Sequence, residues 1–284
     1  MPDVSWQPTQ ILDFIRQVGS STGPCVVNTD SGRAYVKAPQ NNEGPHALVC
    51  DWLGTYLARW FGLPCFETAI VEHDGITDLP LKSGGVAEAG PVFATREVFG
   101  EQWDGKAASL DRLVNPDDLT RLVLFDTWIR NRDRYRPARG QEPARINLGN
   151  VFLAKAGPGR PAATRLMAID HTHVFSRGAE LTRGLSDLSE MQDETVYGLF
   201  PAFFDRLRRP AFDLGVGRLR EFSPKTIREP LDQVPEAWQL GFEMRKTLTE
   251  FLSRRAAYVA DTIENALGRH MPASSLFPDP NTGV

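Results

Sequence analysis

The segment from Asn131 to His171 constrains the fold of this chain more than any other part of the sequence. Two short apolar runs, Val151–Ala154 and Arg165–Ile169, are separated by a loop rich in Gly and Pro, which is the pattern of two joined β-strands. If the strands pair antiparallel, the start of the first lies beside the end of the second. We therefore expect a hairpin whose open end is formed by residues 150 and 170.

Three polar side chains are expected at the open end of this hairpin. Asn150 directly precedes the first strand, Asp170 directly follows the second, and Asp133 follows an expected helix just upstream. Taken singly, each would suit a helix cap or a turn. Together they suit phosphoryl transfer, in which one Asp orients or deprotonates the acceptor hydroxyl while an Asn and a second Asp hold Mg²⁺ against the phosphates. Asn147 competes with Asn150 as the metal ligand.

A loop of small residues, Gly19–Pro24, precedes a second expected hairpin formed by Cys25–Asn28 and Arg33–Lys37. Small residues let backbone N–H groups approach phosphate oxygens, and a lysine supplies a point charge. Lys37 is therefore a candidate phosphate-binding cation, although a solvent-facing lysine on a strand edge fits the same pattern. The candidate side chains of the phosphate loop are Ser20, Ser21 and Thr22.

A helix is expected between Pro45 and Phe61, because apolar residues recur there at helical spacing and Gly62 follows as a stop signal. Asp51 lies among these apolar positions, where an unpaired carboxylate would be costly. Lys37 is the candidate partner, since a strand lysine paired with a helix carboxylate positions the phosphate-binding lysine of protein kinases. The alternative is an Asp at the rim of the helix that faces water.

The rest of the chain predicts two lobes. Phe66–His73 and Val92–Val98 read as further strands, and Asn115 reads as the cap of a central helix that ends just before Asp133. Later helices are expected at Val196–Leu207 and Pro235–Leu267. We therefore predict an α+β, bilobal, protein-kinase-like fold with a small β-rich N-lobe (1–98), a mostly helical C-lobe (99–270) and a disordered tail (271–284).

Composition narrows the classes of function. The chain has 284 residues and a net charge of −4, which does not suggest a nucleic-acid surface. Its three cysteines form no C-x-x-C pair, which fits a reducing compartment, and there is no secretory signal and no apolar run of the ~20 residues that a membrane span needs. A cytoplasmic protein is expected. The P-loop motif G-x-x-x-x-G-K-[ST] is absent, which disfavours a P-loop NTPase.

The order of these segments resembles the HipA-like kinases of bacteria, a branch of the protein-kinase-like fold related to the phosphatidylinositol kinases. The segments that carry the resemblance are G-S-S-T-G-P, G-R-A-Y-V-K, A-L-V-C-D-W-L-G-T-Y-L-A-R-W-F-G-L-P, D-T-W-I-R-N-R-D-R, G-N-V-F-L and A-I-D-H. The resemblance implies an ATP- and Mg²⁺-dependent kinase. It implies that Lys37 grips the α- and β-phosphates, that Asp51 holds Lys37, and that Asp133 orients the acceptor hydroxyl.

The same resemblance implies that Asn150 and Asp170 bind Mg²⁺ and that residues 20–22 cover the phosphates. Two features depart from the family pattern. The helix acid is Asp51 where a Glu is usual, and Tyr135 stands where a His often follows D-R, in a loop lengthened by R-P-A-R-G-Q-E-P-A-R.

The expected reaction is the phosphorylation of protein Ser or Thr. The alternatives are a small-molecule or lipid kinase and a nucleotide-binding pseudokinase that regulates a partner. The expected partner is thus a protein or small-molecule phosphoacceptor, and a regulatory protein partner is not identified by the sequence. A fourth alternative is a metal hydrolase, whose ligands would be Asp133, Asp170, His171 and His173.

Overall fold

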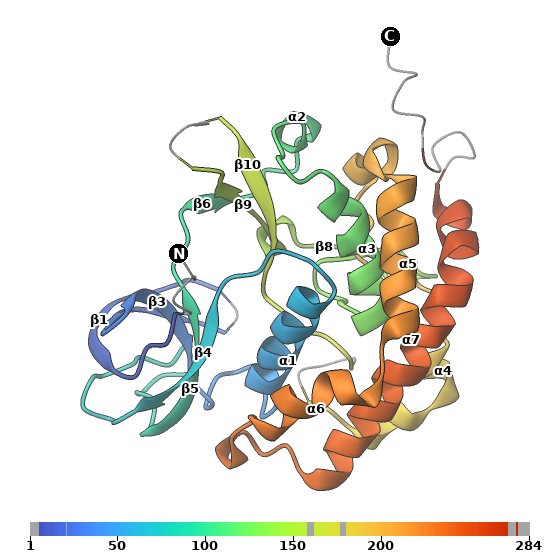
Figure 1. The fold of residues 1–284 in the computed structure, drawn as a ribbon. Coiled ribbons are helices and arrows are strands. Elements are labelled where there is room, and N and C mark those ends of the chain that lie inside the picture. The colour runs from blue at the N-terminus through green and yellow to red at the C-terminus, as the bar shows by residue number, and fades with distance from the viewer. Residues whose placement is uncertain (1–5, 21, 158–161, 177–179, 272–276, 278–284) are drawn as a thin grey trace.

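The computed structural model of the chain describes residues 6–20, 22–157, 162–176, 180–271 and 277 (Figure 1). Its N-terminal part is a five-stranded antiparallel sheet with the strand order β1-β2-β3-β5-β4. The strands are β1 (Ile11–Gln17), β2 (Cys25–Thr29), β3 (Gly32–Lys37), β4 (Thr68–His73) and β5 (Gly90–Arg96). The predicted strands are thus present, with boundaries shifted by up to two residues. Lys37 is the last residue of β3, the central strand of this sheet, and lies opposite Phe93 of β5.

Helix α1 (Ala47–Trp60) connects β3 to β4 and lies between the sheet and the C-terminal helices (Figure 1). It ends as predicted, because Gly62 adopts a φ of +92°, a conformation that side chains with a Cβ rarely take. Most of the helix is buried, including Leu53, Leu57 and the carboxylate of Asp51. Helix α1 therefore carries a charged group into the interior.

The hairpin that organises the sequence is present. Strands β9 (Val151–Lys155) and β10 (Thr164–Ala168) pair antiparallel, with Val151 opposite Ala168, so residues 150 and 170 lie at the same end. Strand β6 (Gly100–Gln102) pairs with the other edge of β9. A second, two-residue hairpin of β7 (Tyr135–Arg136) and β8 (Arg145–Ile146) forms in the lengthened loop after Asp133.

The C-terminal part is mostly helical and completes the predicted fold class. Helix α3 (Asp117–Ile129) lies at its centre and contacts α5 (Arg209–Glu221), α7 (Phe242–His270) and β10. Eleven residues of α3 are buried, which explains why apolar residues lie all around this helix. The α-helices are α2 (Ala107–Leu110), α3 (Asp117–Ile129), α4 (Leu188–Met191), α5 (Arg209–Glu221), α6 (Pro224–Asp232) and α7 (Phe242–His270). The 3-10 turns are η1 (Leu148–Asn150), η2 (Arg183–Ser186), η3 (Pro201–Arg206) and η4 (Glu236–Trp238).

Two predicted helices are shorter than expected. The segment Val196–Leu207 contains only the 3-10 turn η3, because Gly198 adopts a φ of +72° that a right-handed helix does not use. The longest helix begins at Phe242 instead of Pro235. Gln239 has a φ of +58° and separates the turn η4 from α7, so the two cannot form one helix.

The predicted cap at Asn115 is also wrong. Its side chain bonds to strand β10, with Nδ2 donating to the carbonyl of Leu166 at 3.1 Å and Oδ1 accepting from the N–H of Leu166 at 2.9 Å. It thereby fastens the start of α3 to β10. The helix delivers the segment that carries Asp133, as predicted.

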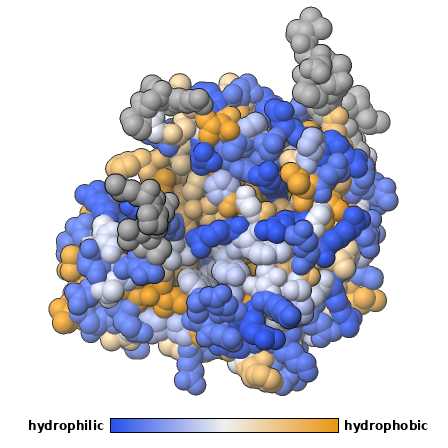
Figure 2. Space-filling view, viewed as in Figure 1, coloured by the Kyte–Doolittle hydropathy of each residue, from blue (hydrophilic) through white to orange (hydrophobic). Residues whose placement is uncertain are grey.

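The face shown in Figure 2 is mostly hydrophilic, with apolar side chains in small separate patches. Among the described residues, no helix is both long enough and apolar enough to cross a bilayer.

Candidate active site

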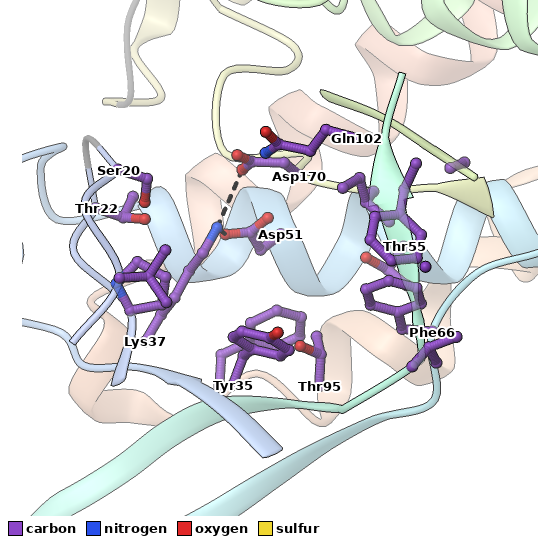
Figure 3. Close-up of a pocket in the computed structure, with 18 of the residues that line it drawn as sticks. Ser20, Thr22, Tyr35, Lys37, Asp51, Thr55, Phe66, Thr95, Gln102 and Asp170 are labelled. Atoms are coloured by element: carbon purple, nitrogen blue, oxygen red, sulfur yellow. Dashed lines mark hydrogen bonds and ion pairs between the residues drawn. The ribbon is translucent and has the colours of Figure 1, made fainter. Parts of the chain in front are cut away.

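The ammonium group of Lys37 lies at the junction of the N-terminal sheet, α1 and the segment after β10 (Figure 3). Its Nζ donates to Oδ2 of Asp51 at 2.8 Å and to Oδ1 of Asp170 at 3.0 Å. It also lies 2.9 Å from Oγ1 of Thr172. The Lys37 side chain is 13% exposed and that of Asp51 only 2%. The predicted ion pair between Lys37 and Asp51 is therefore present and largely shielded from water.

Helix α1 also holds the segment that carries Asp170. The N–H of His171 donates to Oδ1 of Asp51 at 3.0 Å, and Thr172 Oγ1 donates to Oδ2 of Asp51 at 2.8 Å. Asp170 itself adopts a left-handed φ of +55°, which turns the chain sharply after β10. A Cβ on Gly54 would lie 2.4 Å from Cβ of His171, so only glycine lets the helix and this turn pack so closely.

The carboxylate of Asp133 is enclosed by three neighbours. Its Oδ2 accepts hydrogen bonds from Nδ2 of Asn147 and Nδ2 of Asn150, both at 2.9 Å. Its Oδ1 accepts from the guanidinium of Arg145, whose Nε lies at 3.0 Å. The structure thus brings Asp133 and Asn150 together, and it places the competing Asn147 on the same oxygen.

A cavity of about 350 Å³ opens beside Lys37. Charged groups and the hydroxyls of Ser20 and Thr22 line one end, and the other end carries aromatic side chains together with Thr55 and Thr95 (Figure 3). The polar end includes Ser20, Thr22, Lys37, Asp51 and Asp170. The aromatic end includes Tyr35, Phe66, Phe93 and Phe152. Five of the predicted site residues therefore share one cavity, whereas Asp133 and Asn150 are not among its lining residues and Ser21 lies outside the described residues.

Comparison with protein families decides the relationship of this chain. A family model described as HipA-like kinase matches residues 11–198. The chain belongs to the HipA-like kinase family. The matched region runs from strand β1 through the candidate site to the residues after α4. A search of curated proteins found no match to the chain.

Two solved structures show similarity to this HipA-like kinase. The Helicobacter pylori proinflammatory kinase CtkA is 13% identical, with a TM-score of 0.55, and the match covers 90% of this chain and 98% of that one. HipA, in a complex of the Shewanella oneidensis toxin–antitoxin system with HipB and operator DNA, is 10% identical, with a TM-score of 0.44; the match covers 91% of this chain and 66% of that one. The likeness to CtkA supports the fold described above.

In this HipA-like kinase, the side chain of Arg134 bonds to helix α3, to Asn150 and to the residue before Asp170. It is fully buried, and its Nε donates to Oδ2 of Asp126 on α3 at 2.7 Å. Its Nη1 donates to the carbonyl of Asn150, and its Nη2 donates to the carbonyl of Ile169 at 3.1 Å. A single guanidinium, on the residue after Asp133, therefore bonds to the backbone of Asn150 and to the backbone of the residue before Asp170. A planar fork of five donors suits this task.

Neighbouring charges determine the protonation states of Lys37 and Asp170. Burial of the ammonium disfavours its charge, but the carboxylates of Asp170 and Asp51 outweigh burial and raise the pKa of Lys37 above its ordinary value. Burial likewise disfavours ionised Asp170, but the adjacent Lys37 ammonium holds the pKa of Asp170 well below its usual range. Lys37 is therefore cationic and Asp170 anionic at neutral pH.

The contacts and the burial of His171 indicate a structural role for its imidazole. Its Nδ1 lies 3.1 Å from Oγ1 of Thr55, and burial lowers the pKa of the imidazole to about 3, so the ring is neutral. His173 instead pairs with Glu43 at 3.1 Å. Within the described part of the chain, no three His, Cys, Asp or Glu side chains gather in a way that suits a metal ion. This arrangement counts against the metal hydrolase considered from the sequence.

The donor atoms near Asp170 suit magnesium better than zinc. Mg²⁺ takes oxygen ligands and is usually bound by one or two carboxylates together with substrate phosphates, so a cluster of three protein ligands is not required. Asp170 offers a carboxylate. Asn150 directs its Nδ2 to Asp133, which leaves the amide oxygen as its ligand atom. The residues present therefore fit Mg²⁺.

Proposed function

We propose that this HipA-like kinase transfers the γ-phosphoryl group of ATP to a hydroxyl group of a protein Ser or Thr with the help of Mg²⁺. The observation that carries the proposal is the cavity with Lys37, Asp51 and Asp170 at one end and aromatic side chains at the other. The charged end suits phosphates and the aromatic end suits a nucleobase. Its volume of about 350 Å³ lies in the range of small-molecule sites.

Each charged residue has a role in this proposal. Lys37 binds the α- and β-phosphates, and Asp51 keeps the ammonium in place through their 2.8 Å ion pair. Asn150 and Asp170 would hold Mg²⁺, which, when bound, neutralises phosphate charge. The loop that contains Ser20 and Thr22 covers the phosphates, and Lys82 supports that loop by donating to the carbonyl of Ser20 at 2.8 Å.

Asp133 receives or orients the proton of the acceptor hydroxyl. The two Asn amides fix Oδ2, so Oδ1 is the oxygen that faces the reaction once Arg145 moves away. Fixing one oxygen reduces the reorganisation needed in the transition state. Membership of the HipA-like kinase family supports a kinase activity, and we propose a protein as its acceptor.

The test is phosphoryl transfer from γ-labelled ATP by the purified protein, with and without Mg²⁺. Acceptors are Ser- and Thr-containing peptides in one set of reactions and hydroxylated metabolites and lipids in another. Wild type and the matched control Asp205→Asn, an exposed carboxylate in η3, should transfer label. Asp133→Asn and Asp170→Asn should lose at least ~10²-fold in rate.

The acceptor sets separate the remaining alternatives. Label on metabolites or lipids alone would replace the protein acceptor with a small-molecule or lipid acceptor. Binding of ATP without transfer to any acceptor or to water would favour the nucleotide-binding pseudokinase. Equal transfer by all four proteins would contradict the proposed site.

A further inference from the structure

Asp133 is closed on both sides, although its proposed role needs an open oxygen. Its side chain is 12% exposed, and both carboxylate oxygens accept hydrogen bonds. The two Asn donors belong to the segment around η1, whose backbone is fixed, because the N–H of Asn147 donates to the carbonyl of Arg134 and the N–H of Asn150 donates to the carbonyl of Asn147. The donor on Oδ1, Arg145, comes from a different element, the hairpin β7–β8.

The guanidinium of Arg145 is well placed to move. Its side chain is 59% exposed, so little packing holds it. The hairpin that carries Arg145 is held together by other bonds, because Arg136, opposite Arg145 in the register, bonds to Glu142 and to the carbonyl of Pro143 in the connecting loop. The Arg145 side chain can therefore swing without unfolding the strand that carries it. An ion pair whose guanidinium is largely exposed to water is weak, so it breaks easily.

Proton transfer to Asp133 requires the pair to break. The acceptor proton can reach only Oδ1, since Oδ2 is engaged by two amides. When Arg145 leaves Oδ1, a guanidinium is released beside the reacting groups, where negative charge spreads over the oxygens of the transferring phosphoryl. Arginine suits this charge because its fork matches phosphate oxygens.

We propose that Arg145 exchanges Asp133 for the γ-phosphoryl group during transfer and acts there as a catalytic cation supplied by the chain itself. The inference rests on the proposed function. In the step, the bond from the acceptor oxygen to the γ-phosphorus forms and the bond from that phosphorus to the β-phosphate bridging oxygen breaks. ADP leaves with the electron pair, and the hydroxyl proton passes to Oδ1 of Asp133. Arg145 binds the non-bridging oxygens and gains or loses no proton.

This role differs from two others that the same contact allows. An arginine that only masks Asp133 would inhibit the resting enzyme, and its removal would raise the rate. An arginine that binds an acidic group on the acceptor would act in transfer to that acceptor but not in transfer to water. A phosphoryl-binding arginine acts in both reactions.

The experiment compares wild type, Arg145→Ala, Arg145→Lys and Arg139→Ala. Arg139 lies in the same loop and is exposed, so its removal is a control for the loss of one positive charge there. The measurements are kcat and KM for ATP in labelled phosphoryl transfer, kcat for ATP hydrolysis, and the dissociation constant for ADP. ADP lacks the γ-phosphate, so its binding also reports whether each variant keeps a folded site.

Arg145→Ala should lower kcat by ~10²–10³-fold in both transfer and hydrolysis, with KM for ATP and the ADP dissociation constant within about twofold of wild type. Arg145→Lys should recover part of the rate, and Arg139→Ala should match wild type. A kcat for Arg145→Ala that is unchanged or raised, or that falls in transfer but not in hydrolysis, overturns the inference while wild-type turnover still supports the proposed function. Wild type without turnover overturns the proposed function itself, and the inference with it.

Discussion

The Nζ atom of Lys37 lies 3.0 Å from the Oδ1 atom of Asp170, and this ion pair joins the end of β3 to the turn after β10. Asp51 also pairs with Lys37, and the hydroxyl of Thr172 bonds to Lys37, Asp51 and Asp170, so the pair belongs to a network of four side chains. The N-terminal sheet and the β9–β10 hairpin are therefore fixed to each other at the point where we propose that phosphates bind.

Removing the ammonium should affect both activity and stability. In Lys37→Met, the buried carboxylate of Asp51 loses its ion-pair partner, so we expect the free energy of unfolding to fall by about 3 kcal/mol. We also expect kcat to fall by at least ~10²-fold. Urea unfolding and labelled-ATP assays measure the two effects. Lys155→Met, which removes an exposed lysine at the end of β9, is the control and should change neither quantity.

Gly54 tests the close packing of α1 against the turn after Asp170. In Gly54→Ala, the new Cβ would meet Cβ of His171 at 2.4 Å and Cγ at 2.9 Å, and the position of this Cβ is fixed by the backbone. We expect a loss of ~1–3 kcal/mol in the free energy of unfolding. Gly217→Ala in α5 meets no atom of the described residues within 4 Å and should stabilise the protein by up to ~1 kcal/mol. Equal effects of the two substitutions in thermal unfolding would argue against this packing.

Arg134 tests the connection between the parts of the site. In Arg134→Lys, one ammonium cannot reach Asp126 and the carbonyls of Asn150 and Ile169 together, so buried acceptors lose their donors. We expect a loss of ~3–5 kcal/mol in urea unfolding. Arg254→Lys alters an exposed pair with Glu250 and should change stability by less than ~0.5 kcal/mol. A value for Arg134→Lys as small as that of the control would mean that this network contributes little.

The environment of Asp193 leads us to predict a pH dependence of the free energy of unfolding. Burial opposes its ionisation, but hydrogen bonds from Tyr197 and Thr195 and the charges of Arg255 and Arg130 outweigh burial and lower its pKa to about 2. A depressed pKa in the folded state gives stability that is complete above the unfolded pKa of ~3.9 and is lost as the pH falls through about 2.

The stability difference between wild type and Asp193→Asn should therefore stay constant from pH 7 to about pH 5 and shrink by about 2 kcal/mol as the pH falls toward 2. Urea unfolding of both proteins at several pH values measures it. A difference that does not change with pH would show that Asp193 has an ordinary pKa in the folded protein.

Local signals predicted much of the fold. Two short apolar runs and the Gly/Pro loop between them predicted β9 and β10, and Gly62 marked the end of α1. The segment after Phe175 was harder, because Tyr197, Phe200 and Phe203 suggest a helix by composition yet pack into the core from an irregular chain. Such packing depends on partners that are distant in the sequence.

In the candidate site, too, some features could be predicted from the sequence and others could not. Lys37 and Asp51 were predictable as partners because a buried carboxylate needs a cation. Sequence reasoning missed Thr172, although its place directly after D-H was a usable signal. It also missed the contacts of Arg134 and Arg145, since each joins elements whose relative placement only the folded chain defines. The pairing of Asn147 and Asn150 on one oxygen of Asp133 is likewise visible only in three dimensions.

The most direct test of the central claim is a crystal structure of the protein with Mg²⁺ and a non-hydrolysable ATP analogue. We expect the base among the aromatic side chains of the cavity, the phosphates at Lys37, and the metal bound by oxygens of Asn150 and Asp170, with the γ-phosphoryl group beside Asp133. A nucleotide bound elsewhere, or a metal held without Asn150 and Asp170, would contradict the account.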